Sequence, residues 1–213
     1  MLTGTDREPR HRISFYSFNL RGGPGAGSYF QDPVTVGGWI HYAGQFDSVH
    51  TWIFKNGVPR DQDRLAGYKI APRNGTAPVR IGTRDFGSFF QGSIARVAIY
   101  STRLSAATLA AHAAIADAGA YDRAVLSEAS LVGYWRLDEA TGTVATDARG
   151  ANHGTYCTMA MRPFVACDTA RVKCSSVHVG RASPADGSSS GWSSPGSYAT
   201  PSRWSSAICS QVR

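Results

Sequence analysis

The stretch Leu131–Tyr156, LVGYWRLDEATGTVATDARGANHGTY, decides how this chain must fold. It reads like the first strand and first loop of a β-domain: an apolar and aromatic run gives way to a mostly polar stretch that includes Gly142, Asp147, Gly150 and Asn152. It comes, however, after the segment SIARVAIYSTRLSAATLAAH (residues 93–112), which reads like the end of such a domain. The fold must therefore explain why a stretch typical of the start of a β-domain follows a segment typical of its end.

Short strand patterns separated by turn signals run from Ile13 to Tyr100. ISFYSFNL stops at the glycine-rich loop RGGPGAG, and VHTWIFK meets Asn56-Gly57, a pair that supplies the positive φ angles of a tight hairpin. Several short strands joined in this way predict an antiparallel β-sandwich. After Tyr100 the alanine-rich run RLSAATLAAHAAIADAGA predicts a short helix with Ser105 as its N-cap.

Composition sets the boundaries of the remaining segments. Residues 157–213 are serine-rich, contain all four cysteines and have no C-x-x-C pair, so we expect a disordered tail without a zinc site. Residues 1–12 are charged and polar, which excludes a signal peptide and predicts a second disordered segment. Residues 117–130 are expected to be a linker.

The charge pattern bears on partners. The net charge is +7, but six of the cations follow Thr155 and the others are interspersed with acids, whereas nucleic-acid surfaces cluster their cations. No apolar run reaches about 18 residues, the length that a membrane span needs. We therefore expect a monomer that neither binds nucleic acid nor inserts into membranes.

Four stretches together resemble a known family: WIHYAGQFD, TWIFKNGVP, APVRIGTRDFGSFFQGSIARVAIYSTRLSAATLAAH and the Leu131–Tyr156 stretch. In this order they are similar to the laminin G-like domains of the concanavalin A-like lectin/glucanase superfamily, in their bacterial form. The resemblance implies an all-β, two-sheet antiparallel jelly-roll sandwich, here with a short C-terminal helix and a disordered tail. It also implies an extracellular or cell-surface location.

The resemblance gives a domain plan. Residues 13–116 correspond to a sandwich that lacks its first strand, and residues 131–156 correspond to the opening strand of a second module, as in a slice through tandem modules. Because the family places its first and last strands side by side, LVGYWRL is predicted to pair with ARVAIY and complete one composite sandwich. Leu131, Trp135 and Leu137 are expected on one face, with Val132, Tyr134 and Arg136 on the other.

Catalysis and metal binding find little support in the residues. Retaining glucanases need two closely spaced carboxylates, which E-x-D-x-E on a strand provides, but none of the three glutamates, Glu8, Glu128 and Glu139, fits that pattern. His41 lies on the Trp39 face of its strand and is interpreted as a packed histidine. Calcium stays open as a ligand, although Asp47, Asp61, Asp63 and Asp85 are read as solvated carboxylates in turns. The family's I-D-E-V motif reads Ile94-Ala95-Arg96-Val97 here, so any site that uses those acids is in doubt. No other cofactor is expected.

Binding is the function that the resemblance implies. The loop TRDFGSFFQG offers Arg84, Asp85, Phe86 and Phe89 as a glycan platform, while Phe90 matches a position that the family packs. The same loop could instead be a hydrophobic lid over the sandwich edge. The sequence thus predicts a non-catalytic binding or adhesion module for a glycan or a surface protein. A structural spacer and an accessory fragment of a glycoside hydrolase remain as alternatives.

Overall fold

A computed structural model describes residues 10–17, 25–33, 38–68, 70, 78–83, 90, 92–157, 176–177 and 207–212. The strands that it describes are β1 (Arg10–Ser17), β2 (Ala26–Pro33), β3 (Ile40–Phe46), β4 (His50–Lys55), β5 (Val58–Arg64), β6 (Ile94–Tyr100), β7 (Leu131–Trp135), β8 (Val144–Ala145), β9 (Gly154–Cys157), β10 (Ser176–Val177) and β11 (Ala207–Val212). The helices are η1 (Leu65–Tyr68), α1 (Ala106–Ala114) and α2 (Ala118–Ser127).

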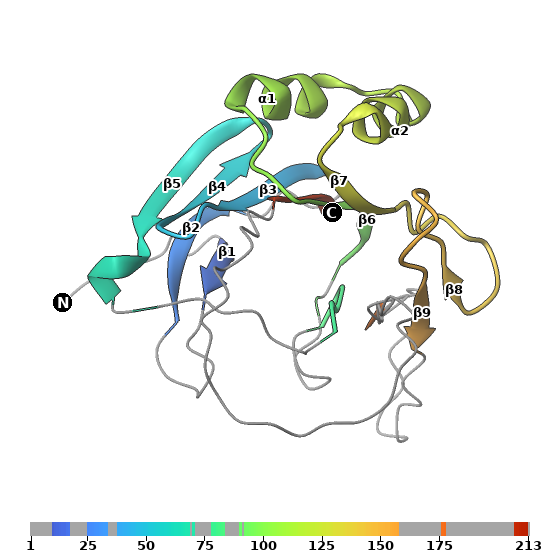
Figure 1. Ribbon diagram of the computed structural model, residues 1–213, viewed down its shortest axis with the longest axis horizontal. Helices are drawn as coiled ribbons and strands as arrows, with labels where there is room; N and C mark the ends of the chain where they lie inside the picture. Colours follow the sequence, from blue (N-terminus) through green and yellow to red (C-terminus); the bar gives the residue numbers. More distant parts are fainter. Residues whose placement is uncertain are drawn as a thin grey trace, which may run out of the picture.

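The strands form three antiparallel sheets. The largest has the order β5-β4-β3-β11-β6-β7, β1 and β2 form a separate hairpin, and β8, β9 and β10 form a small sheet. Figure 1 shows α1 and α2 over one side of the largest sheet and the β1–β2 hairpin on the other side. This antiparallel architecture agrees with the predicted sandwich class, while the complete jelly-roll topology stays a prediction.

The Asn56-Gly57 turn joins β4 to β5 as the sequence predicts. Both residues have the positive φ of a tight hairpin, 51° and 77°. The Asn56 side chain also accepts a hydrogen bond from the His41 backbone N–H at 2.9 Å, which ties the turn to β3. A Cβ on Gly57 would lie 2.6 Å from the Cα of Ala110, so α1 rests directly against this turn.

The β6–β7 pairing joins the two parts of the chain that the sequence left apart. Val97 lies opposite Trp135, Ala98 opposite Tyr134 and Ile99 opposite Gly133, in the antiparallel sense that the sequence predicts. Trp135 is 2% exposed, and its indole N–H donates to the Asn152 carbonyl at 2.9 Å. The predicted closure by this strand is therefore present, while its origin in a second module stays a prediction.

The predicted facing of Leu131 is wrong. Tyr100 pairs with Leu131 although Ile99 pairs with Gly133, so Val132 is an extra residue in the strand. This β-bulge breaks the alternation of side chains and turns Leu131 to the helix-covered face, away from Trp135. Bulges cannot be read from a periodic pattern, which is why the expectation failed.

The outer edge of β7 is covered by the loop that follows it. The buried Asp147 carboxylate accepts the Tyr134 backbone N–H at 2.8 Å, and the Ala148 N–H donates to the Tyr134 carbonyl at 2.7 Å. The Asn152 side chain donates to the Val132 carbonyl at 3.1 Å. An open strand edge is a template for pairing with other chains, so these bonds protect β7 from aggregation.

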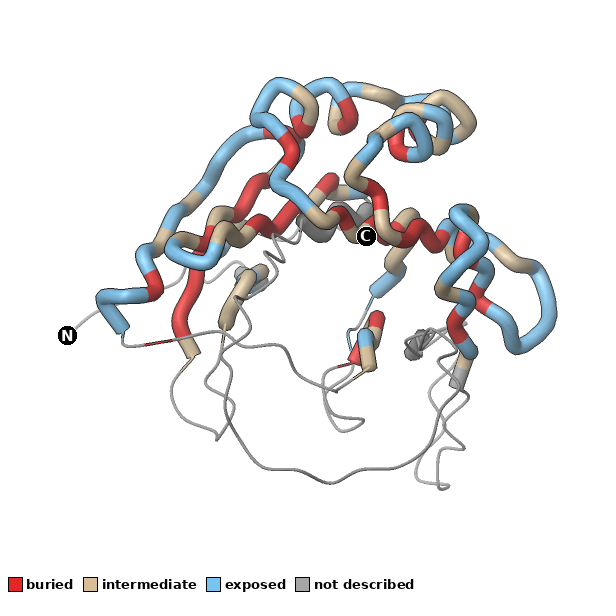
Figure 2. The backbone as a smooth tube through the Cα atoms, in the orientation of Figure 1, coloured by how far each residue is buried: buried red, intermediate tan, exposed pale blue. Residues whose placement is uncertain are grey.

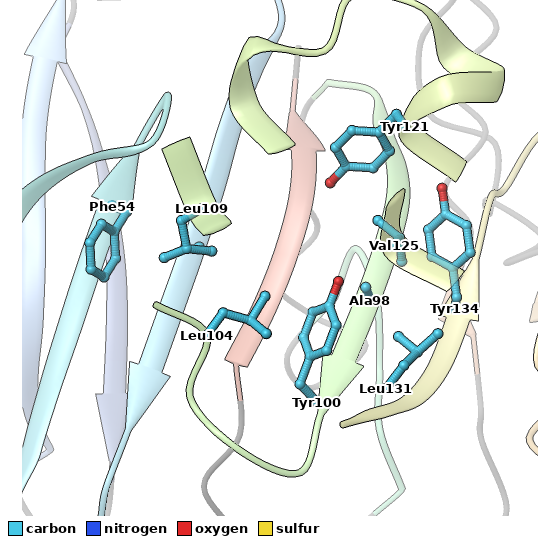
Figure 3. Close-up of a cluster of buried hydrophobic side chains, with 10 residues drawn as sticks. Phe54, Ala98, Tyr100, Leu104, Leu109, Tyr121, Val125, Leu131 and Tyr134 are labelled. Atoms are coloured by element: carbon cyan, nitrogen blue, oxygen red, sulfur yellow. The ribbon is translucent and has the colours of Figure 1, made fainter. Parts of the chain in front are cut away.

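Helices α1 and α2 cover the other face of the same strands. Figure 3 shows the buried cluster between the helices and the sheet, made of Phe54, Ala98, Tyr100, Leu104, Leu109, Tyr121, Val125, Leu131 and Tyr134. The predicted helix after Ser105 is present, with the Ser105 side chain accepting from the Thr108 N–H. The segment expected as a linker contains α2 instead. Asp117 caps that helix through the Ala120 N–H, and the i, i+4 pair Tyr121 and Val125 buries its apolar stripe.

The β1–β2 hairpin packs against the opposite face of β3 and β4. The buried Ser28 hydroxyl donates to the Thr51 carbonyl at 2.8 Å, and the Thr51 hydroxyl accepts the Ser28 N–H at 3.1 Å. The Phe15 ring fills the space over Gly44, where a Cβ would lie 2.3 Å from it. These contacts bury the inner side of the hairpin and leave its outer side to solvent.

Both terminal segments contain strands where disorder was expected. β1 begins at Arg10, and β11 lies between β3 and β6, with Ala207 opposite both Gln45 and Tyr100. The serine-rich composition of residues 157–213 predicts disorder and hides the short strand pattern near their end. The short run AICSQV nevertheless supplies the backbone N–H and C=O groups that the facing edges of β3 and β6 need. Residues 158–175 and 178–206 lie outside the described residues.

We predict that Trp135→Ala lowers the free energy of unfolding by about 3–5 kcal/mol, because it removes a large side chain from the core and leaves a cavity. Trp39→Ala is the matched control, since Trp39 is 46% exposed, and it should cost no more than about 1 kcal/mol. Urea denaturation followed by fluorescence measures both. Equal costs would show that Trp135 is not a core residue.

We predict that Asp147→Asn costs about 2–3 kcal/mol, because a side-chain amide would turn an N–H donor toward backbone N–H groups that need an acceptor. The Asp147 Oδ2 atom accepts from the Asn152 N–H at 2.9 Å and from the Ala151 N–H at 3.2 Å. Asp138→Asn, at an exposed position in the same loop, should leave the thermal midpoint nearly unchanged. Indistinguishable midpoints for the two variants would refute the role of Asp147 as an edge cap.

Candidate functional site

The four residues predicted as a glycan platform, Arg84, Asp85, Phe86 and Phe89, lie outside the described residues, so that prediction stays untested. The structure describes the two ends of their loop. The Phe90 N–H donates to the Gly82 carbonyl at 2.8 Å, which brings those ends together. Phe90 itself is 38% exposed, so the expectation that it is packed is wrong.

A different cluster of exposed and half-buried aromatic and charged side chains lies on and beside β5. We name it the tyrosine rim and define it as Arg12, Tyr16, Tyr29, Asp61, Asp63 and Tyr68. Tyr29 is 42% exposed and Tyr68 is 53% exposed. In Figure 2 the tube along β5 and η1 is largely coloured as exposed. Exposing large aromatic rings to water costs free energy, so a group of them on one surface indicates a binding site.

Strand register brings the first three residues of the rim together. Tyr29 on β2 pairs with Ser14 on β1, which places Arg12 and Tyr16 at the two diagonal positions on the same face. The Arg12 guanidinium lies 3.9 Å from the centre of the Tyr29 ring and 5.3 Å from the centre of the Tyr16 ring, and it also donates to the Tyr16 hydroxyl. Arg12 therefore covers one face of Tyr29 and orients it.

The two acids of the rim come from β5, not from turns as the sequence suggested. Asp61 and Asp63 are two residues apart, so their side chains leave the same face of the strand. The Asp61 carboxylate accepts the Tyr29 backbone N–H and the Gln62 backbone N–H, both at 2.9 Å. The Asp61 side chain thus links β5 to the backbone of β2.

Asp63 makes a different contact. Its Oδ1 atom accepts from the Tyr68 hydroxyl at 3.2 Å, and its Oδ2 atom has no hydrogen bond within the described part of the chain. The negative charge of Asp63, its hydrogen bond to the phenol and the more distant Asp61 raise the pKa of Tyr68 above its ordinary value. The surface around Tyr68 therefore has a negative potential and one carboxylate oxygen available to a ligand.

Asp32 holds the rim's hairpin in place. The Arg60 guanidinium donates to both Asp32 oxygens, at 2.8 and 2.9 Å, and the Lys55 ammonium donates to Oδ2 at 2.5 Å. These hydrogen bonds hold the pKa of Asp32 well below its ordinary range. The two cations are thereby engaged by β2 and are not free to bind a ligand.

Asp47, which the sequence places in a turn, forms its hydrogen bonds within the β3–β4 turn. Its Oδ1 atom accepts the His50 N–H at 2.7 Å and the Val49 N–H at 3.0 Å, and Arg103 lies 3.5 Å from Oδ2. Burial raises the pKa of Asp47, but these backbone hydrogen bonds and nearby cations outweigh it and hold the pKa below its ordinary value. In the described residues no three His, Cys, Asp or Glu side chains converge on a common point. Calcium binding stays untested, and Asp85 lies outside those residues.

The glutamates that are described serve the fold. Glu139 accepts the Thr146 N–H at 2.7 Å and the Tyr156 hydroxyl at 2.5 Å, and Glu128 ends α2 beside His112. His41 is buried at 5% exposure, as expected for a packed histidine. The sequence reading missed the tyrosine rim because its tyrosines come from three separate segments that only the sheet registers bring together.

We predict that Asp61→Ala lowers the free energy of unfolding by about 1 kcal/mol, because it leaves the Tyr29 N–H without an acceptor. Asp63→Ala removes only an exposed contact to a phenol and should change that free energy by less than about 0.5 kcal/mol. Chemical denaturation at neutral pH measures both. If Asp63→Ala lowers the free energy of unfolding more than Asp61→Ala does, Asp61 is not the structural carboxylate and Asp63 is not the one available to a ligand.

Comparison with known proteins relates part of this chain to a family. Residues 6–110 match the family model of the laminin G type that is described as concanavalin A-like lectin/glucanases superfamily. No curated protein and no solved structure gives a significant match. The family match does not extend to Leu131–Tyr156, so the assignment of that stretch to a second module stays a prediction. The family relationship therefore applies to residues 6–110, which match the concanavalin A-like lectin/glucanases superfamily.

Proposed function

We propose that this protein is a non-catalytic carbohydrate-binding module of jelly-roll type within a larger extracellular or surface protein, and that it binds an uncharged glycan at the tyrosine rim. The family match supports the general class, because domains of this superfamily often bind carbohydrate or mediate adhesion and are typically extracellular. None of the helices in the described residues is long and apolar enough to span a membrane.

The proposal depends mainly on the exposure of two tyrosine rings, Tyr29 and Tyr68, and on the Asp63 carboxylate next to Tyr68. The C–H face of a pyranose stacks on an aromatic ring, and a carboxylate accepts hydrogen bonds from neighbouring sugar hydroxyls. Arg12 already covers one face of Tyr29 and thereby orients the ring. The free Oδ2 atom of Asp63 supplies the acceptor, within the part of the chain that is described.

Charge favours neutral over acidic sugars. The potential that raises the pKa of Tyr68 comes first from Asp63, and it would repel a carboxylate or sulfate stacked on that ring. Arg60 and Lys55 are held by Asp32, which leaves Arg12 as the rim's own cation. The non-catalytic part of the proposal is supported by the contacts of two glutamates: the Glu128 carboxylate lies 3.5 Å from the His112 ring, and Glu139 accepts hydrogen bonds from Thr146 and Tyr156.

The test is a glycan array followed by calorimetry with a matched pair of ligands that share one core, such as lactose and 3′-sialyllactose. For a neutral ligand, the double variant Tyr29→Ala/Tyr68→Ala should bind at least about tenfold more weakly, the effect of losing about 1.4 kcal/mol. Asp63→Asn should also weaken binding of the neutral ligand, and it should reduce the ratio of the affinities for the neutral and the sialylated ligand. Trp39→Ala and Asp138→Asn are the controls for an exposed aromatic residue and for net charge, and both should bind as the unchanged protein does.

Each contrary outcome has one reading. If the unchanged protein binds no glycan, the carbohydrate proposal fails and a structural or protein-interaction module remains. If Phe86→Ala/Phe89→Ala abolishes binding while Tyr29→Ala/Tyr68→Ala does not, the site lies in the loop and not at the rim. Preferred binding of the sialylated ligand would overturn the neutral-glycan assignment alone.

A further inference from the structure

Two buried imidazoles, one from the sheet and one from a helix, pack against the same tyrosine ring. His41 comes from β3 and is 5% exposed, and His112 comes from α1 and is 4% exposed. The centre of the Tyr121 ring of α2 is 6.0 Å from each imidazole centre, and the ring is edge-on to both. One ring from each of three elements therefore meets at the boundary between the helices and the sheet.

The hydrogen bonding of these imidazoles is incomplete. Neither ring nitrogen of His41 has a hydrogen-bond partner within the described part of the chain, and the same holds for Nδ1 of His112. The His112 Nε2 atom lies 3.5 Å from the Glu128 carboxylate. A buried polar group without a partner costs free energy, and a buried cation without a counter-charge costs much more.

The charges on the surrounding elements are already paired. From α2, Asp122 accepts from Arg96 of β6 at 3.2 Å and from the Tyr134 hydroxyl of β7 at 2.5 Å, and Arg136 lies 3.8 Å away. Burial, followed by the hydrogen bond to Asp122, raises the pKa of Tyr134, so this phenol stays neutral. Tyr100 of β6 and Tyr121 of α2 are the other titratable groups in the cluster.

Glu128 is thus the one carboxylate in the described residues that is close to either imidazole, and it lies on the His112 side. Around His41 no described carboxylate lies within ion-pair distance. Protonation of both rings would place two cations at one boundary with a single counter-charge.

We propose that α1 and α2 form an acid-released cap: protonation of His41 and His112 undocks the helix pair from the sheet while the sheet stays paired. The buried contacts of the cap are apolar, chiefly Leu109 and Val125, and they do not compensate a charge. The other described imidazoles, His50 and His153, lie at turns beside Asp47 and Asp147, outside the helix–sheet boundary.

The pH window follows from the direction of the shifts. Burial, and then the charge of His112, lowers the pKa of His41 to about 4, and burial also lowers the pKa of His112 although Glu128 opposes it. A released imidazole titrates near 6.5. The docked state is therefore fully favoured above pH 6.5 and is lost as the pH falls toward 4, because the released state binds more protons.

The test is hydrogen exchange of the full chain at pH 7.5 and pH 5.0, with protection factors corrected for the intrinsic effect of pH. Protection of residues 106–127 should fall by about 30-fold from His41 alone, whereas residues 94–100 and 131–135 should keep theirs. His41→Phe keeps a ring without a titrating group and should remove that 30-fold drop. His50→Phe is the control and should retain it.

A second measurement covers the case in which His41→Phe fails to fold. An NMR titration of the unchanged protein should give a His41 pKa well below 6.5. A His41 pKa near 6.5, or helix protection that is unchanged down to pH 5.0, would overturn the proposal. A parallel loss of protection in β6 and β7 would also overturn it, because it would show global unfolding and not release of a cap.

Discussion

The antiparallel pairing of β6 with β7 is the interaction on which the rest of the structure depends. It joins segments that are more than thirty residues apart, Val97 to Trp135, and gives both faces of the sheet their cores. On one face Trp135 packs with Val97, Ile81 and Ala145, and on the other Leu131 and Tyr134 join the cluster beneath the helices. A strand that buries side chains on both faces cannot be removed without exposing two cores.

The pairing also determines what can lie around it. β7 is a sheet edge, and Asp147 and Asn152 bind the backbone groups that this edge would otherwise expose. β7 begins at Leu131, shortly after α2 ends at Ser127. The pairing of β7 with β6 therefore holds the C-terminal end of α2 close to the sheet. Asp122, which binds Arg96 on β6 and Tyr134 on β7, connects the same three elements by charge. Far from this edge, the β1–β2 hairpin is anchored to β4 and β5 through Asp32, and there the surface carries exposed aromatic rings.

The sequence predicted what depends on local pattern. The Asn56-Gly57 turn, the Ser105 cap and the partner of ARVAIY were recoverable, because each rests on turn chemistry, capping or a resemblance that brings two strands together. The sheet face on which Leu131 lies could not be predicted, because the extra residue at Val132 reverses it and the alternation of apolar residues does not reveal this bulge. α2 was missed because alanine and glycine dominate its start, although Asp117 and the Tyr121–Val125 spacing were available signals. The tyrosine rim and the imidazole pair depend on strand register and layer packing, which no linear reading supplies.

Hydrogen exchange of β6 in a Gly133→Pro variant tests the central pairing most directly. Proline in a strand interior removes a backbone N–H, and the space at Gly133 is taken by the Trp135 ring, 2.6 Å from where a Cβ would lie. If β7 holds the sheet as described, residues 94–100 lose at least about tenfold of their protection while the β4–β5 hairpin retains its own. Full protection of residues 94–100 in the folded variant would contradict the account.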